Sequence, residues 1–298
     1  MNPVQCKAQF NAKTQRRACD AKVYRLKTIE ELRTPWEIYP SLAMWQEAEV
    51  TGALRVSQEV YSPQLRNRRR VLVYLPASYW SSERRYPVLY MQDAQNLFDP
   101  ATSYTGSTWR VGATMTQLAA EGIEAIVVAM DHGARRRIRE YNPFPYWRGG
   151  RGGVYVRFVA ETVKRIIDHD FRTLPDQAHT AILGSSMGGL ISLYAYATYP
   201  QVYGAAGAMS PSLWVADGAM YNVVRDFYVP GGRIYLDNGP RESSARPIRD
   251  LLIERGWRAG ADLCYVYARG AQHSERAWAT RLPDALRFLL GNMPGARE

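Results

Sequence analysis

The chain contains several short runs of apolar residues that have the length of buried β-strands. The first two runs, from Leu54 to Val60 and from Val71 to Leu75, flank the basic residues Asn67 to Arg70, which predicts two strands joined by a hairpin turn at those residues. Further strands are predicted at 87–91, 124–130, 180–183, 205–209, 233–237 and 263–268. We expect one folded domain, from residue 51 to residue 292.

Helix-length segments separate most of the later runs. Between Val154 and Asp168, apolar side chains such as Val159, Val163 and Ile167 recur at the spacing of one helical face. Apolar strands that alternate with amphipathic helices predict a largely parallel sheet with helices on both faces, and such sheets bind ligands at the carboxyl ends of their strands. Functional residues are therefore expected directly after predicted strands.

Residues 1–50 differ from the rest of the chain. They are rich in lysine and arginine and show no sustained apolar period, which predicts a basic and partly irregular extension. The chain has neither a signal-peptide core after the first basic residues nor a run of about 20 apolar residues, so we expect a cytoplasmic protein with no membrane association. The basic residues lack interleaved aromatic side chains, and no nucleic-acid partner is expected.

Composition narrows the chemistry further. The net charge of +10 comes almost entirely from 33 arginines against 5 lysines. Arginine suits carboxylate and phosphate ligands, so either an anionic substrate or a merely arginine-rich, solvated surface explains this bias. The 3 cysteines have no CxxC spacing and the 4 histidines no HExxH motif, so we expect neither a disulfide framework nor a metal site.

A serine flanked by glycines follows the predicted strand at 180–183. Residues 184–188 read Gly-Ser-Ser-Met-Gly and precede a predicted helix, which is the strand, turn and helix context of the G-x-S-x-G motif. Cβ atoms at Gly184 or Gly188 would collide with the adjoining strand and helix. We predict Ser186 as a nucleophile and the N–H of Met187 as an oxyanion donor, and the alternative is a glycine turn with a capping serine.

A serine hydroxyl needs a neighbouring base, and in this context the histidine comes last in the chain. His273 is the histidine of the C-terminal third and follows the predicted strand at 263–268. The acid that orients it is expected after the strand at 233–237, where Asp237 and Glu242 compete. Spacing alone leaves both open.

Seven stretches of the chain together resemble the esterase family of α/β-hydrolases that includes enterochelin esterase, feruloyl esterases, S-formylglutathione hydrolase and mycolyltransferases. The resemblance covers residues 52–290 and implies the α/β-hydrolase fold, an α/β architecture with a mostly parallel central sheet and helices on both faces. The stretches, in order, are VLVYLPASY, YPVLYMQDAQNLFD, AIVVAMDHGARRRIREYNP, AILGSSMGGL, AMSPSLW, YLDNGPRE and GAQHSERAWATRLPDAL.

The resemblance also implies two site residues. The family's acid lies in a G-x-x-[DE] turn that Gly239 to Glu242 matches, so it favours Glu242, with Asp237 as a structural residue. The second oxyanion N–H of the family maps onto Gln95. Many relatives have glycine where Ala94 stands here, and this departure puts the role of Gln95 in question.

The loop from Asp131 to Trp147 combines arginines with aromatic residues and follows a predicted strand, where ligands bind. One interpretation is that the loop binds a bulky aromatic or anionic ester; the other is that its arginines brace a long loop. The candidate substrate-binding residues, here and in the matching stretches, are Asp93, Asp131, Arg135, Arg137, Tyr141 and Trp214.

These observations predict a serine carboxylic ester hydrolase that acts through an acyl-enzyme, with aromatic or siderophore-type esters as candidate substrates. No cofactor is implied. An acyltransferase would use the same residues, and a non-catalytic binding protein on a hydrolase scaffold is a further alternative. The sequence leaves the oligomeric state open.

Overall fold

A nine-stranded sheet organises the part of the chain that this computed structural model describes, which comprises residues 28–32, 34–39, 50–145, 150–226, 232–291 and 293. Contacts divide the chain into two units, Met1–Glu31 and Leu32–Glu298, and every strand belongs to the second unit. The short helix α2 (Ile29–Leu32) lies where the first unit ends. The strands are β1 (Glu37–Ile38), β2 (Ala53–Ser62), β3 (Asn67–Leu75), β4 (Val88–Gln92), β5 (Ile126–Met130), β6 (Thr180–Ser185), β7 (Ala205–Met209), β8 (Arg233–Asn238) and β9 (Leu263–Tyr267).

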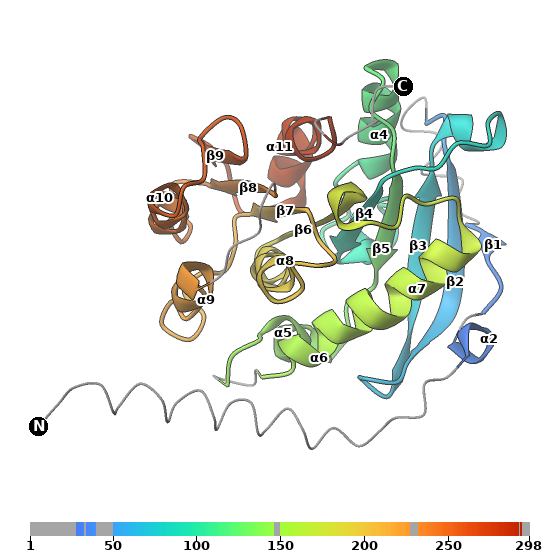
Figure 1. The fold of residues 1–298 in the computed structure, drawn as a ribbon, viewed down its shortest axis with the longest axis horizontal. Coiled ribbons are helices and arrows are strands. Elements are labelled where there is room, and N and C mark those ends of the chain that lie inside the picture. Colours follow the sequence, from blue (N-terminus) through green and yellow to red (C-terminus); the bar gives the residue numbers. More distant parts are fainter. Residues whose placement is uncertain are drawn as a thin grey trace, which may run out of the picture. The chain divides into compact units, whose positions relative to one another are not determined.

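The strand order is β1-β2-β3-β5-β4-β6-β7-β8-β9. Pairing is antiparallel from β1 to β5 and parallel from β5 to β9, as Figure 1 shows. In the parallel part, Ser185 pairs with Met209 and Met209 with Asp237, so the carboxyl ends of β6, β7 and β8 are level. The loops that follow these strands therefore meet at one edge of the sheet.

Helices cover both faces of the parallel strands (Figure 1). Helix α8 packs on β6 and β7, while α11 packs on β6, β7 and β8 and on α4. Every residue of β4 and β5 is buried, which explains why buried parallel strands appear in the sequence as continuous apolar runs. The helices are α4 (Val111–Ala120), α5 (Arg137–Tyr141), α6 (Gly152–Arg157), α7 (Lys164–Asp170), α8 (Met187–Thr198), α9 (Met220–Asp226), α10 (Arg246–Glu254) and α11 (Glu275–Leu290).

The predicted α/β fold and its strands are confirmed, and two details differ from the expectation. The amphipathic helix at 154–168 is present, but its middle, Phe158–Val163, is π-helical between α6 and α7. The predicted turn at Asn67 to Arg70 is wrong, because these residues begin β3. Arg69 and Arg70 extend the strand since their guanidinium groups pair with the carboxylates of Glu140 and Asp131.

The basic extension that we predicted at residues 1–50 falls mostly outside the described residues. Within it, β1 pairs with β2 in antiparallel fashion, and the phenol of Tyr39 is buried and donates a hydrogen bond to Asp99 at 3.0 Å. Ordered structure of the second unit thus starts before residue 51. Tyr146 and Trp147, which belong to the predicted aromatic and arginine-rich loop, lie outside the described residues.

Candidate active site

Ser186 occupies the sharp turn that joins β6 to α8. Its backbone has φ 55° and ψ −123°, a left-handed conformation that non-glycine residues rarely adopt. The turn is held by backbone hydrogen bonds from Ser186 N–H to the Met209 carbonyl at 2.9 Å and from Ser212 N–H to the Ser186 carbonyl at 3.0 Å. The backbone at Met209 and Ser212 therefore fixes the conformation that presents the Ser186 side chain at the sheet edge.

Gly184 is required sterically, as predicted from the motif, and Gly188 is closely packed. A Cβ atom at Gly184 would lie 2.6 Å from the backbone carbon and oxygen of Gly188. A Cβ atom at Gly188 would lie 3.1 Å from the carboxylate of Asp93 and from Cβ of Gln92. The loop after β4 is thus packed directly against the first turn of α8.

His273 and Glu242 are joined by a hydrogen bond. The His273 Nδ1 to Glu242 Oε1 distance is 2.8 Å, and the two residues come from the loops after β9 and β8. The carboxylate of Glu242 is 5% exposed and also accepts the N–H of Gly239. Burial raises the pKa of Glu242, but hydrogen bonds from Gly239 N–H, from the Ser210 hydroxyl and from His273 outweigh this and lower the pKa below its ordinary value.

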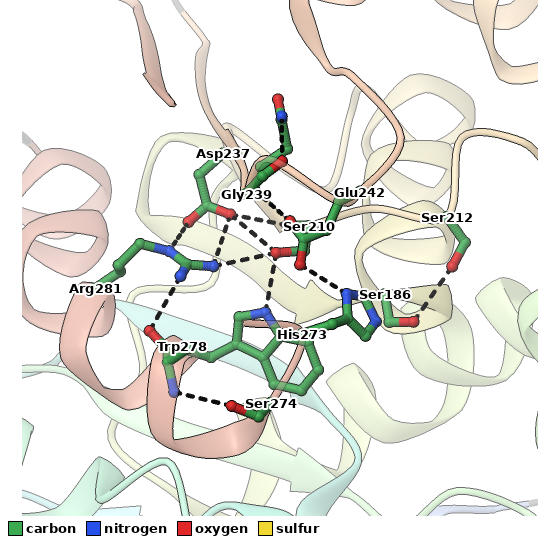
Figure 2. A network of polar contacts seen from close by, with 12 residues as sticks. Ser186, Ser210, Ser212, Asp237, Gly239, Glu242, His273, Ser274, Trp278 and Arg281 are labelled. Atoms are coloured by element: carbon green, nitrogen blue, oxygen red, sulfur yellow. Dashed lines mark hydrogen bonds and ion pairs between the residues drawn. The ribbon is translucent and has the colours of Figure 1, made fainter. Parts of the chain in front are cut away.

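The competing carboxylate, Asp237, is fully buried and paired elsewhere. Arg281 of α11 donates hydrogen bonds from Nε and Nη2 to the two carboxylate oxygens of Asp237, at 2.8 Å and 3.2 Å. The N–H of Ser210 and the hydroxyl of Tyr235 donate to the same carboxylate. The Ser210 hydroxyl accepts from Arg281 and from Trp278 Nε1, both at 3.1 Å, so its own proton is left for a carboxylate. Figure 2 shows this cluster beside the pair of Glu242 and His273.

The imidazole of His273 points toward Ser186 with the edge that Glu242 does not use (Figure 2). Ser186 Oγ lies 3.3 Å from Ser212 Oγ, which is the hydrogen bond that its hydroxyl makes within the described residues. The ring of Trp278 meets the imidazole edge-on, with centroids 4.9 Å apart. Nucleophile–base hydrogen bonds are often long or absent without substrate, so the bond of Ser186 to Ser212 does not exclude a hydrogen bond to His273 in a substrate complex.

The backbone N–H groups of Met187 and Gln95 are without a hydrogen-bond acceptor among the described residues. Met187 is the first residue of α8, where helical N–H groups have no intrahelical partner. Gln95 lies in a short 3-10 turn, Ala94–Asn96, directly after β4. Both N–H groups are thus available to a ligand, and their role as oxyanion donors stays a prediction.

Five of the six predicted substrate-binding residues lie in or beside the loop after β5. Asp93 and Arg137 form a forked ion pair with distances of 2.7 Å and 2.8 Å, and Tyr141 is fully buried beneath them. Asp131 is paired in the same manner with Arg70 of β3. Arg135 is exposed, with no ionic partner among the described residues. For all of these except Arg135, the contacts agree with the bracing interpretation of the loop.

Trp214, the sixth candidate, is 57% exposed and follows Ser212 by two residues. It lines a hollow of about 340 Å³ together with Tyr221, Ser243 and Pro247. Ser243 is the residue after Glu242, and Trp214 belongs to the same loop as Ser212, which contacts Ser186. The hollow therefore borders the loops that hold Ser212 and Glu242. An apolar group of a substrate has space here.

Sequence reasoning missed four residues of the site: Ser210, Ser212, Trp278 and Arg281. Ser210 and Ser212 directly follow β7, so the same position after a strand that identified the other candidates was available for them. Trp278 and Arg281 lie on α11, one turn apart, on the face that covers the carboxyl end of β8. Only the fold brings them to Asp237 and Ser210.

The described residues contain no group of three or more histidine, cysteine, aspartate or glutamate side chains arranged to hold a metal ion. Among the described helices, none combines the length and the apolar character that crossing a bilayer requires.

Comparison with known proteins shows the family of the chain. The family model described as "Putative esterase" matches residues 62–289, well over half of the chain. The chain is 24% identical over 243 residues to the uncharacterized protein YbbA of Bacillus subtilis (strain 168), which covers 75% of this chain and 93% of that protein. It is 32% identical over 139 residues to the siderophore triacetylfusarinine C esterase of Aspergillus fumigatus, which covers 43% and 44% of the two chains.

Solved structures share the fold. The ferric enterobactin esterase of Salmonella typhimurium matches with a TM-score of 0.65 at 19% identity, over 84% of this chain and 61% of that one. Its likeness supports the assignment of the sheet, with its parallel strands and flanking helices, to the α/β-hydrolase fold. The chain therefore belongs to the esterase family and is an esterase of the serine hydrolase type with the α/β-hydrolase fold.

Proposed function

We propose that the chain is a carboxylic ester hydrolase whose triad is Ser186, His273 and Glu242. The observation that carries this is that two features meet at the same edge of the sheet. One is Ser186 with its positive φ, and the other is the hydrogen bond of 2.8 Å between His273 and Glu242. Glu242 is the acid because Asp237 is occupied by Arg281 and Ser210, whereas Glu242 faces the imidazole. The lowered pKa of Glu242 supports this role, since a charged carboxylate is needed to hold the imidazole tautomer.

The reaction runs in two halves. Ser186 Oγ attacks the ester carbonyl carbon while His273 Nε2 takes the hydroxyl proton, and the N–H groups of Met187 and Gln95 stabilise the oxyanion. Collapse of the intermediate breaks the bond to the leaving alcohol, which receives the proton from His273. Water then attacks the acyl-enzyme with His273 again as base, and the carboxylic acid leaves with Ser186 restored.

Aromatic esters, including siderophore-type esters, are the substrates that we propose. The exposed side chains of Trp214 and Tyr221 line the hollow that includes Ser243, the residue after Glu242, and aromatic side chains bind planar apolar groups well. A relative whose name is siderophore triacetylfusarinine C esterase supports the siderophore-type ester.

The proposal is tested with p-nitrophenyl esters, aryl esters and a fluorophosphonate probe. We expect wild type to hydrolyse the esters and to be labelled, and both signals to vanish in Ser186→Ala and to persist in Ser185→Ala. Ser185 is the matched control because it is the buried serine directly before Ser186 at the end of β6. Labelling that survives in Ser186→Ala contradicts the assignment, and an added alcohol that becomes the main acyl acceptor favours acyl transfer over hydrolysis.

A further inference from the structure

The predicted oxyanion loop, which we define as residues 93–96, carries a buried negative charge. The carboxylate of Asp93 lies against Gly188, because a Cβ atom at Gly188 would be 3.1 Å from Asp93 Oδ2. Gly188 directly follows Met187, and Gln95 lies two residues beyond Asp93. A carboxylate in this place repels the negative charge that develops on the ester oxygen, and it competes for the positive end of the α8 dipole.

The guanidinium of Arg137 forms a bidentate ion pair with this carboxylate. Its Nε and Nη2 lie 2.7 Å and 2.8 Å from the two Asp93 oxygens, so the pair is a bidentate fork. Burial acts to lower the pKa of Arg137, but the charge of Asp93 outweighs it and raises the pKa above the ordinary value. The guanidinium therefore remains charged, and its fork is occupied by Asp93.

The rest of the segment from His132 to Tyr141 fixes the backbone of the oxyanion loop. The side-chain amide of Gln95 accepts the N–H of His132 at 3.2 Å and donates to the His132 carbonyl at 3.3 Å. The N–H of Asp93, whose φ is 58°, donates to the Tyr141 hydroxyl at 3.3 Å. Three contacts thus hold the loop in the orientation that leaves the backbone N–H of Gln95 available.

A second buried carboxylate near the loop is already balanced. Glu275 accepts from Asn96 Nδ2 at 3.3 Å and from Thr105 Oγ1 at 3.1 Å, and it is the first residue of α11, where the helix dipole favours a negative charge. Asp93 also lies near a helix N-terminus, that of α8, but the charged side chain that pairs with it among the described residues is that of Arg137. The charge that Arg137 neutralises is therefore the one that bears on the oxyanion.

We propose that Arg137 is a positioning residue for ester cleavage, because it neutralises Asp93 beside the oxyanion donors and holds the loop that presents the N–H of Gln95. This inference rests on the proposed function and replaces the expectation that Arg137 binds an anionic substrate. It predicts that Arg137 acts on the rate of acylation and not on substrate affinity.

The test measures the p-nitrophenol burst of a neutral p-nitrophenyl ester by stopped flow, which separates the acylation rate constant from the substrate dissociation constant. In Arg137→Ala we expect the rate constant to fall roughly 10- to 100-fold, less than or comparable to the loss of one oxyanion donor, with dissociation constants within about 3-fold. Adding Asp93→Asn to Arg137→Ala removes the uncompensated charge and should recover at least about 5-fold of the rate. A purely structural role predicts no such recovery.

Arg70→Ala is the matched control. Arg70 of β3 makes a bidentate pair with Asp131, with distances of 2.9 Å and 3.2 Å, and is 22% exposed, against 26% for Arg137. Unlike Arg137, neither member of this pair has a side-chain hydrogen bond to residues 93–96 within the described residues. We expect its acylation rate within about 3-fold of wild type. Should Arg137→Ala fail to fold, Arg137→Gln with and without Asp93→Asn gives the same comparison with side chains of similar size.

The outcomes are distinct. An unchanged rate in Arg137→Ala, a loss confined to substrate affinity, a double variant no faster than the single one, or an equal loss in Arg70→Ala overturns the inference. A burst that survives in Ser186→Ala overturns the proposed function together with it. An inert Ser186→Ala with a normal burst in Arg137→Ala overturns the inference alone.

Discussion

Isosteric replacement of Asp237 and of Glu242 is predicted to damage the protein in two different ways. Each partner of Asp237 within the described residues is a donor: the guanidinium of Arg281, the N–H of Ser210 and the hydroxyl of Tyr235. In Asp237→Asn, one amide NH₂ must face a donor, and the buried charge of Arg281 loses its counter-ion. Breaking a buried ion pair in this manner costs about 3–5 kcal/mol, which lowers the melting temperature by roughly 6–20 °C.

Glu242→Gln leaves little buried charge behind, because His273 is 46% exposed. Its amide oxygen can still accept the N–H of Gly239, but the NH₂ group then faces His273 Nδ1 and favours the tautomer that is protonated on Nε2. That tautomer cannot take the Ser186 proton. We expect kcat/KM to fall about 10³- to 10⁴-fold, with a loss of stability of only about 1–2 kcal/mol.

The assay pairs ester hydrolysis with thermal and urea unfolding of wild type and both variants. Asp237→Asn, measured well below its melting temperature, should retain much of its activity. The reasoning is refuted if Glu242→Gln keeps more than about a tenth of wild-type kcat/KM, or if Asp237→Asn loses activity without losing stability.

Three further predictions follow from single features of the structure. Because the pKa of Glu242 is lowered, its charged form stabilises the fold at pH values above the unfolded-state pKa of about 4.3, and this contribution is lost as pH falls through the lower folded-state pKa; the stability difference between wild type and Glu242→Gln should therefore shrink below pH 4 in urea unfolding, and a constant difference from pH 3 to 7 would contradict it. Burial raises the pKa of the Cys264 thiol, so peptide mapping after iodoacetamide treatment at pH 7.5 should find Cys264 alkylated more slowly than a free cysteine peptide, and equal rates would speak against it. Gly184→Ala places a Cβ atom 2.6 Å from the backbone of Gly188 and should destabilise the protein by about 1–3 kcal/mol, which an unchanged melting temperature would disprove.

The sheet was predictable from the sequence because its parallel strands are buried on both faces. Runs such as Ile126–Met130 consist of apolar residues throughout, and the glycine-flanked serine predicted the sharp turn between β6 and α8. The turn at Asn67 to Arg70 was mispredicted because a run of basic residues normally lies in a solvent-exposed segment such as a turn. Here two of these arginines find carboxylates more than 60 residues away, which no local pattern reveals.

The choice between Asp237 and Glu242 illustrates the same limit at the site. Both follow the same strand, and position after a strand does not separate them. The separation depends on Arg281, which lies 44 residues beyond Asp237 and reaches it only after α11 has packed on the sheet. The family resemblance favoured Glu242, and the long-range contact of Arg281 with Asp237 supports the proposal that Glu242 is the acid.

The left-handed backbone at Ser186 also has a practical consequence for trapping a complex. A non-glycine residue held in such a conformation costs about 1–3 kcal/mol, and alanine in its place keeps this cost because it keeps Cβ. Glycine relieves it, so Ser186→Gly should melt at a higher temperature than Ser186→Ala while being equally unable to form an acyl-enzyme. The glycine variant is therefore the better choice for co-crystallising an intact ester, because it leaves more room at the ester carbonyl carbon and is more stable than the alanine variant.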